Sequence, residues 1–259
     1  MPIDLVDTHC HLTAKELFPH RRRVITDAVN VGVSRMITVS CSMGEIQEAL
    51  ATSTMHSGIW VAAGIHPHQA SRVGRDDLKR LAELWREDSI VAVGEIGLDF
   101  YYDFSPRDMQ QTVFEDQLDL AQQSGLPVII HSRNAHDLVV RLLVKHGYVD
   151  RAVVFHCFSG TTDEAAELRA HGWRTSFTGI ITFKNSAAQQ ETCVETPMDQ
   201  LMFESDAPYL SPEPVRRMRP NEPANVVHTI RYAAQLRGES FETLARATTA
   251  NAVSFFRLK

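Results

Sequence analysis

Residues 3–11 of the chain have the sequence IDLVDTHCH, in which a short apolar run ends in two histidines that flank a cysteine. Such a run predicts a strand, and the residues that follow it distinguish two kinds of α/β fold. A doubly wound sheet that binds a dinucleotide has a glycine-rich turn after its first strand, where this chain has His9-Cys10-His11. The sequence here therefore argues against a dinucleotide-binding sheet.

Seven further runs of the same kind follow, and most are apolar on both faces, as in VAVGE and VIIH. Such strands are typical of parallel sheets that helices cover on both sides. The eight predicted strands are Ile3–Asp7, Arg35–Ser40, Ile59–Ile65, Ile90–Gly94, Pro127–Ile130, Ala152–Phe155, Trp173–Phe177 and Gln200–Glu204.

Amphipathic stretches alternate with these strands, and several end next to a glycine where a helix would stop: Gly32, Gly125, Gly147 and Gly172. The predicted helices are Arg21–Val31, Glu45–His56, Asp76–Arg86, Arg107–Ser124, Ala135–His146, Thr162–Ala170, Asn185–Val194, Asn221–Leu236 and Phe241–Phe256. Eight strand–helix units predict an α/β fold, the (β/α)8 or TIM barrel, as a single domain over residues 1–259 with an extra C-terminal helix.

Composition limits the class of protein. The 259 residues are 44% hydrophobic and 22% charged, which excludes a mainly disordered chain. With 26 Lys and Arg against 32 Asp and Glu, the net charge is −6, so nucleic acid would need a local basic patch or a bound cation. No signal peptide, membrane span or CxxC pair is evident, and we expect a cytoplasmic protein with reduced cysteines, most simply a monomer.

Six of the eight predicted strand ends bear a histidine or a carboxylate. Active sites of (β/α)8 barrels form at these C-terminal ends, and apolar strands seldom finish in such residues for packing reasons. The side chains concerned are His9, His11, His66, Glu95, His131, His156, Glu204 and Asp206. Each histidine alone fits a hydrogen-bonded core residue, but the set together predicts a metal centre.

His9 and His11 share one strand face because side chains alternate, so both imidazoles can bind one ion, whereas Cys10 faces the other side. Histidine and carboxylate ligands suit zinc. Manganese or magnesium becomes plausible when carboxylates and water occupy more of the ligand positions. The six predicted ligands exceed one tetrahedral shell and suggest two divalent ions bridged by Glu95; they are His9, His11, Glu95, His131, His156 and Asp206. We expect Asp206 to accept a proton from the attacking water and Glu204 to brace the site or contact the substrate. Metal-assisted hydrolysis is the predicted reaction class.

The chain resembles the TatD family of metal-dependent deoxyribonucleases, which are amidohydrolase-type hydrolases with a TIM barrel. The resemblance rests on DTHCHL, AAGIHPH, VAVGEIGLDFYYD, PVIIHSRNAHD, VVFHCFSG, FESDAPYL and RPNEPANV, in that order. It implies a nuclease that acts on DNA, commonly as a 3′→5′ exonuclease on single strands or 3′ ends, with a place in DNA repair. It also implies one ion on His9, His11, Glu95 and Asp206, a second on Glu95, His131 and His156, and a substrate contact at His66.

Two positions depart from the family pattern: Asn134 follows HSR in place of an aspartate, and Pro220 precedes NEP in place of a basic residue. Arg133 is a candidate phosphate clamp or else the partner of Asp99 or Asp137. The arginines of residues 216–219 could steer phosphate or form ordinary surface, and Arg21-Arg22-Arg23 suits surface better. Phe100 fits a hydrophobic plug that closes the loop. Tyr101 and Tyr102 could also belong to such a plug, or they could stack on bases of a single strand.

Two alternatives to a nuclease are open to the sequence. The same scaffold supports small-molecule hydrolases that act on lactones, amides or phosphoesters, and fold cannot choose among them. Related amidohydrolases often bridge their ions with a carboxylated lysine, and the glutamate at strand four favours the nuclease branch. A structural metal site is usually closed, four-coordinate and rich in cysteine, which the six His and carboxylate ligands argue against.

Overall fold

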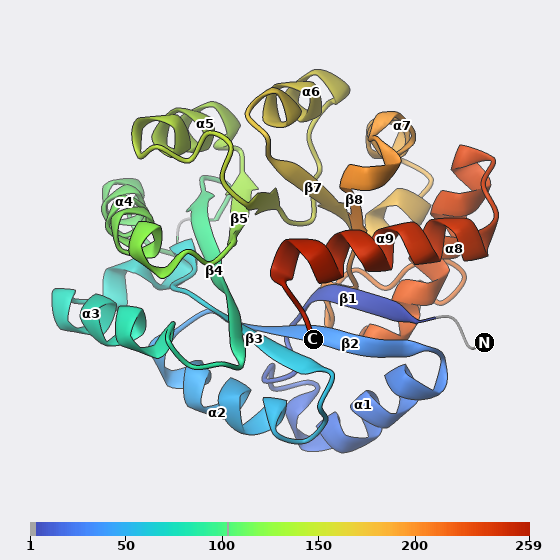
Figure 1. Cartoon of the computed structure of the whole chain (residues 1–259), viewed down its shortest axis with the longest axis horizontal. Helices are drawn as coiled ribbons and strands as arrows, with labels where there is room; N and C mark the ends of the chain where they lie inside the picture. Colours follow the sequence, from blue (N-terminus) through green and yellow to red (C-terminus); the bar gives the residue numbers. More distant parts are fainter. Residues whose placement is uncertain (1–3, 103) are drawn as a thin grey trace.

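The computed structural model describes residues 4–102 and 104–259, and its eight strands form one parallel sheet in the order β1 to β8. Each strand pairs with the next one in sequence, and the helices between them surround the sheet (Figure 1). The strands are β1 Leu5–Cys10, β2 Val33–Ser40, β3 Ile59–Ala63, β4 Ile90–Asp99, β5 Val128–Arg133, β6 Val153–Phe155, β7 Arg174–Phe177 and β8 Leu201–Phe203. The predicted (β/α)8 barrel is confirmed.

One helix follows each strand, and a ninth completes the chain. They are α1 Arg21–Asn30, α2 Met43–Ser53, α3 Arg75–Leu84, α4 Arg107–Ser124, α5 His136–Lys145, α6 Thr162–Ala170, α7 Ala187–Glu195, α8 Val226–Arg237 and α9 Phe241–Phe256. The predicted stop of α4 is confirmed, because Gly125 caps that helix with a φ of 66°, which glycine adopts without strain. None of the described helices is both long and apolar enough to cross a membrane.

Several predicted bounds were wrong. β1 runs to Cys10 rather than Asp7, and Ile3 of the predicted strand lies outside the described residues. β4 continues past Gly94 to Asp99, since its last residues still pair with β5. α8 begins at Val226, because the residue before Pro223 is extended, as prolines require of the residue that precedes them.

The barrel closes where β1 meets β8. The Asp206 N–H donates to the His9 carbonyl at 2.9 Å, and the His11 N–H donates to the Ala207 carbonyl at 2.7 Å. The Thr8 hydroxyl adds a bond to the Phe203 carbonyl at 3.1 Å. The first and last strands therefore join beside the residues predicted to hold metal.

Apolar side chains from all eight strands but β7 fill the inside of the barrel, and the end of α9 joins the same cluster. Phe255, Phe256 and Leu258 pack against interior residues that include Val6, Ile37, Val39, Ala62, Val91, Ile129, Val154 and Met202. Figure 1 shows α9 lying across this end of the barrel. α9 thus covers the N-terminal ends of the strands and leaves the C-terminal ends for the site.

Candidate metal centre

Strand alternation brings His131 and His156 to the inside of the barrel at its C-terminal end. His131 lies two residues after the interior Ile129, and His156 lies two residues after Val154. Residues two apart on a strand share a face, so an interior apolar residue is followed by an interior imidazole. His9 and Glu95 lie where β1 and β4 change register against their neighbouring strands, and they join the same group of ligand atoms.

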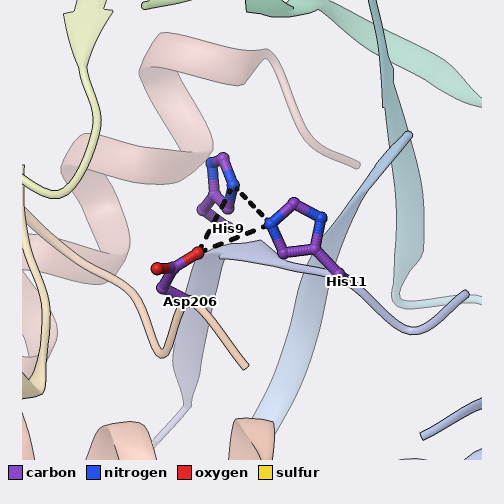
Figure 2. Close-up of side chains that lie close together, drawn as sticks. All are labelled: His9, His11 and Asp206. Carbon is purple, nitrogen blue, oxygen red and sulfur yellow. Dashed lines mark hydrogen bonds and ion pairs between the residues drawn. The ribbon is translucent and has the colours of Figure 1, made fainter. Parts of the chain in front are cut away.

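His9, His11 and Asp206 form the first group (Figure 2). The Nε2 atoms of the two histidines are 3.2 Å apart. Asp206 Oδ1 lies 3.4 Å from His11 Nε2 and 3.8 Å from His9 Nε2. One oxygen of Glu95, Oε2, lies 3.5 Å from His9 Nε2 and extends this group.

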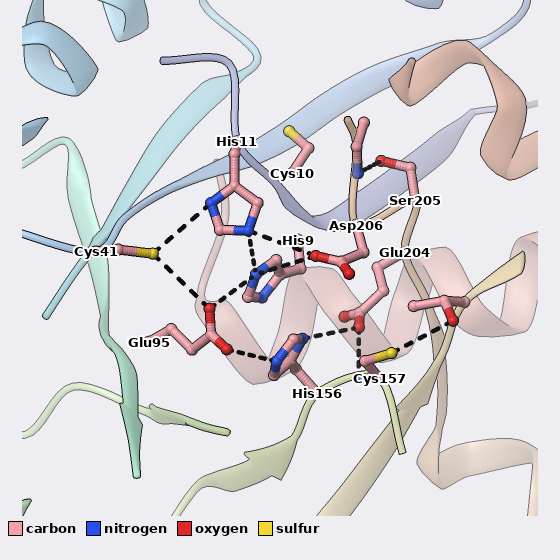
Figure 3. A network of polar contacts seen from close by, with 12 residues as sticks. His9, Cys10, His11, Cys41, Glu95, His156, Cys157, Glu204, Ser205 and Asp206 are labelled. Atoms are coloured by element: carbon pink, nitrogen blue, oxygen red, sulfur yellow. Dashed lines mark hydrogen bonds and ion pairs between the residues drawn. The ribbon is translucent and has the colours of Figure 1, made fainter. Parts of the chain in front are cut away.

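The other oxygen of Glu95 faces a second group, of which Figure 3 shows His156. Glu95 Oε1 is 2.6 Å from His131 Nδ1 and 2.6 Å from His156 Nε2. These two nitrogens are 3.3 Å apart. His66 Nε2 lies 3.5 Å from the same oxygen, so His66 is close enough to belong to the ligand set.

The spacing of these atoms fits bound divalent ions. Ligand atoms about 2.0–2.1 Å from one tetrahedral ion lie about 3.4 Å from one another. The nitrogen pairs at 3.2 and 3.3 Å have this separation, and Glu95 offers one oxygen to each group. In each group, the lone pairs of the two nitrogens could bind one cation. The donor set of imidazole and carboxylate suits zinc or manganese.

Burial and charge set the protonation of this centre. Burial opposes ionisation of Glu95, but the charges of His156 and His66 and the hydrogen bonds from His131 and His156 hold its pKa well below its usual range. Burial also opposes charge on Asp206, and His11 and His9 lower its pKa. Burial lowers the pKa of His66 to about 4, so this imidazole is neutral at pH 7.

Glu204 is buried next to His156, on the side of the imidazole ring that faces away from Glu95. Its side chain is 1% exposed, and its Oε1 accepts the Cys157 N–H at 2.6 Å and lies 3.4 Å from His156 Nδ1. Its Oε2 accepts the Ser176 hydroxyl at 2.6 Å. These contacts favour bracing of His156, and such burial leaves little surface for the substrate contact also considered for Glu204.

Asp7 braces the other side of the centre, next to the barrel seam. It accepts the Ser205 N–H at 2.8 Å and the Ser205 hydroxyl at 2.6 Å, so Ser205 turns away from the ligands. Burial raises the pKa of Asp7 to about 7, although the hydrogen bonds from Ser205 and His9 oppose the shift. The sequence did not identify this brace.

Sequence reasoning also missed two residues that touch the ligands. Asp99 Oδ2 lies 3.2 Å from His131 Nε2 and 2.8 Å from His68 Nε2. Cys41 Sγ lies 3.8 Å from His11 Nδ1 and 3.9 Å from Glu95 Oε2 (Figure 3). Cys41 directly follows β2, so its place at a strand end was the available signal.

The substrate-contact candidates lie around the mouth. Arg133 is exposed, and its guanidinium lies over Tyr101 and Tyr102 rather than within ion-pair distance of Asp99 or Asp137. Asn134, with a φ of 54°, lines a cavity of about 620 Å³ that His156 also borders.

The basic segments flanking the mouth make local contacts. Arg216 stacks on Phe183 at 3.7 Å, and Arg217 and Arg219 are exposed. Arg23 pairs with Glu222 at 2.6 Å, so one of the three N-terminal arginines has a fixed partner. Phe100 packs partly buried against the core, as expected of a plug.

Known proteins are similar to this chain over nearly its whole length. The family model described as TatD related DNase matches residues 6–257. The uncharacterized metal-dependent hydrolase YabD of Bacillus subtilis is 37% identical over 98% of this chain and 99% of its own length. The 3′-5′ ssDNA/RNA exonuclease TatD of Cronobacter sakazakii is 36% identical over 97% of each chain.

Solved structures agree with the sequence relatives. The crystal structure of YjjV, a TatD homologue from Escherichia coli, superposes with a TM-score of 0.93 at 28% identity and covers all of both chains. Family model, relatives and fold thus coincide over almost the whole length. The chain belongs to the TatD-related DNase family and is a metal-dependent hydrolase.

Proposed function

We propose that this protein is a 3′→5′ exonuclease that removes nucleotides from single-stranded DNA with two divalent ions. One observation carries the proposal: the two oxygens of Glu95 face two separate groups of ligands, His9 with His11 and Asp206 on one side and His131 with His156 on the other. A carboxylate in that position is the bridge that a two-metal hydrolase requires.

The names of the relatives support the substrate. Several proteins 33–36% identical to this chain are named 3′-5′ ssDNA/RNA exonucleases, including TatD of Escherichia coli. The net charge of −6 is no obstacle, because phosphate is met at a centre whose ligand set suits cations. Among the described residues, the exposed Arg133 adds a positive charge at the mouth.

Asp206 is the proposed general base. It is 9% exposed, whereas His9 is fully buried, and its lowered pKa keeps it ionised at neutral pH. Bound divalent ions would neutralise the phosphate and acidify a water molecule. Asp206 then accepts the proton as the water oxygen bonds to phosphorus and the bond from phosphorus to the leaving oxygen breaks.

Neighbouring residues hold this arrangement in place. Glu204 and Asp99 fix His156 and His131 through contacts to the ring nitrogens that face away from Glu95. Such partners set the tautomer and orientation of a metal-binding histidine. His66 borders the second group and is proposed to contact the scissile phosphate or to complete the ligand set.

All of these residues belong to one chain, so the proposed reaction needs no residue from a second copy, and we propose that residues 1–259 form a single domain. Removal of single-stranded ends is a step in DNA repair, and we propose repair as its setting.

The decisive experiment is digestion of single-stranded DNA labelled at the 3′ or the 5′ end. Chelated protein is restored with Mg²⁺, Mn²⁺ or Zn²⁺ and compared with a His131→Ala/His156→Ala variant. Stepwise loss from the 3′ end, restored by metal and absent from the variant, is the expected result. Internal cuts or loss from the 5′ end would overturn the assigned polarity.

The same experiment addresses the alternative. Protein that binds metal but leaves DNA and RNA intact would favour a small-molecule hydrolase. Lactones, amides and phosphoesters would then be the next substrates to test.

A further inference from the structure

Three aromatic side chains next to the metal centre are exposed to solvent. Tyr101, Tyr102 and Phe104, here called the aromatic turn, are 57%, 39% and 65% exposed. They follow β4, which supplies Glu95, and precede α4. Exposed apolar side chains that lie together, rather than scattered singly, are typical of interaction sites.

The rings of the aromatic turn contact one another. Tyr102 and Phe104 are nearly parallel, with an interplanar angle of 13° and centroids 5.4 Å apart, and Tyr101 meets Tyr102 edge to face at 4.8 Å. Ring contacts continue inward, because His68 touches Phe104 at 4.8 Å and His66 at 4.3 Å. The aromatic turn thus begins two ring contacts from the metal centre.

Arg133 adds a cation to the aromatic turn. Its guanidinium carbon lies 4.2 Å from the Tyr101 ring centroid and 4.9 Å from that of Tyr102. The nearby carboxylate of Asp99 instead lies beside the ring nitrogens of His68 and His131. A planar cation stacked on rings can still donate hydrogen bonds to phosphate from its edge.

Asp99 fixes the aromatic turn relative to the metal centre. Its Oδ1 accepts the N–H groups of Tyr101 and Tyr102, each at 2.9 Å. Its Oδ2 contacts the ring nitrogens of His68 and His131. One buried carboxylate therefore holds both a proposed metal ligand and the start of the turn.

We infer that the aromatic turn and Arg133 form a platform that stacks bases of a single strand entering the metal centre. This inference rests on the proposed function and adds a way of recognising the strand. Stacking on aromatic side chains tolerates any base, because every base has a π face, and it requires bases released from a duplex. The platform would thus favour single strands without reading their sequence.

The first test compares kcat/KM on single-stranded DNA for Tyr101→Ala, Tyr102→Ala and Phe104→Ala with the unchanged protein. Stacking of one base predicts a loss of roughly 5- to 150-fold for the residues that carry it. Tyr102→Phe, which keeps the ring, should restore most of the loss. Val149→Ala, which alters an exposed apolar residue in the loop between α5 and β6, is the surface control.

The second test removes bases instead of rings. Strands with one abasic site at successive positions from the scissile end should show the largest loss at one or two positions. In the Tyr102→Ala protein, those positions should no longer matter, since ring and base contribute to the same contact. Chelated protein should also change 2-aminopurine fluorescence at these positions, which requires no catalysis.

Arg133 has its own signature. Arg133→Ala should reduce by about one the slope of log affinity against log salt, because one phosphate contact is lost. Arg133→Lys keeps the charge and should restore the salt slope. It should not restore the contribution of the planar guanidinium that stacks on the tyrosine rings.

The outcomes separate the two proposals. If the unchanged protein digests single strands and the alanine variants match it at every abasic position, the platform is wrong and the exonuclease stands. If the unchanged protein cuts neither DNA nor RNA, the proposed function fails, and the platform fails with it.

Discussion

Glu95 is the residue on which both halves of the metal centre depend. Its two oxygens contact nitrogens from strands β1, β5 and the end of β6, and the side chain is 3% exposed. A buried carboxylate is stable as an anion only with cations or strong donors around it. The same burial that makes ionisation costly therefore favours bound cations next to this carboxylate.

Glu95→Ala should abolish hydrolysis and leave the fold intact, because it removes the proposed bridge and a single side chain. Metal analysis should show fewer than two ions per chain, and circular dichroism should match the unchanged protein. Full activity at equal metal content would contradict the bridging role.

Gly97 is required by the close approach of β4 to β5. Its φ is 142°, and an added Cβ would lie 2.0 Å from the His131 carbonyl oxygen. Gly97→Ala should cost at least about 1–2 kcal/mol and shift His131. A lower melting temperature together with weaker metal binding would show this, and unchanged metal binding would exclude any effect on His131.

Residue types at strand ends could be predicted from the sequence, but their partners could not. His9-x-His11 shares a face by strand geometry alone, and so its role in the centre follows from spacing. The contact of Asp99 with His131 depends on how far β4 extends beside β5, and that of Cys41 with His11 depends on how β2 pairs with β1. These are tertiary facts without a local signal.

Helices α4 and α5 are joined by a cluster of charges away from the site. Glu115 on α4 contacts Lys145 and His146 at the end of α5, and His146 also contacts Asp119 at 2.6 Å. The bond from Lys145 and those from Gln111 and His146 lower the pKa of Glu115 to about 2. Burial opposes charge on His146, but the bonds to Glu115 and Asp119 raise its pKa overall.

This cluster should stabilise the protein most between about pH 4.5 and 6.5. The Glu115 contribution is lost as pH falls from 4.5 toward 2, and the His146 contribution is lost as pH rises through its raised pKa. Glu115→Gln should therefore cost about 1 kcal/mol near pH 6 and less at pH 9. Denaturant unfolding at both values tests this, and an equal cost at both would exclude the His146 contribution.

α9 closes the N-terminal end of the barrel through its last turn. Phe256 is 2% exposed and belongs to the cluster that fills the barrel interior. Phe256→Ala should lower the free energy of unfolding by about 3–5 kcal/mol, as for other large buried aromatics. Thermal melting measures the loss, and a change below 1 kcal/mol would show that α9 is dispensable there.

Element types followed the sequence well, but only some of the element ends did. α4, α6 and α9 have the predicted bounds, because capping residues or glycine mark them. α8 starts five residues late, since Asn221 bonds to the Ser205 carbonyl and Pro223 keeps the preceding chain extended. Local pattern alone cannot anticipate that a polar residue is used by a distant loop.

The proposed metal ligands connect parts of the barrel that are far apart in the sequence. They come from β1, β4, β5 and the segments after β6 and β8. Ions bound to the folded chain stabilise it by mass action. At a free metal concentration of a hundred times Kd, binding adds about 2.7 kcal/mol to the free energy of unfolding. Removing the metal with a chelator should therefore lower the melting temperature by roughly 5–10 °C. Re-addition of metal should reverse the shift, and the Glu95→Ala variant should respond less.

The seam between β1 and β8 has a consequence for the protein during its synthesis. The site combines His9 and His11, made first, with Asp206, which emerges after four fifths of the chain has been translated. A ribosome-bound chain that stops before residue 206 has no complete first ligand group. If the protein is the nuclease proposed here, it cannot attack nucleic acid beside the ribosome until its last strand arrives.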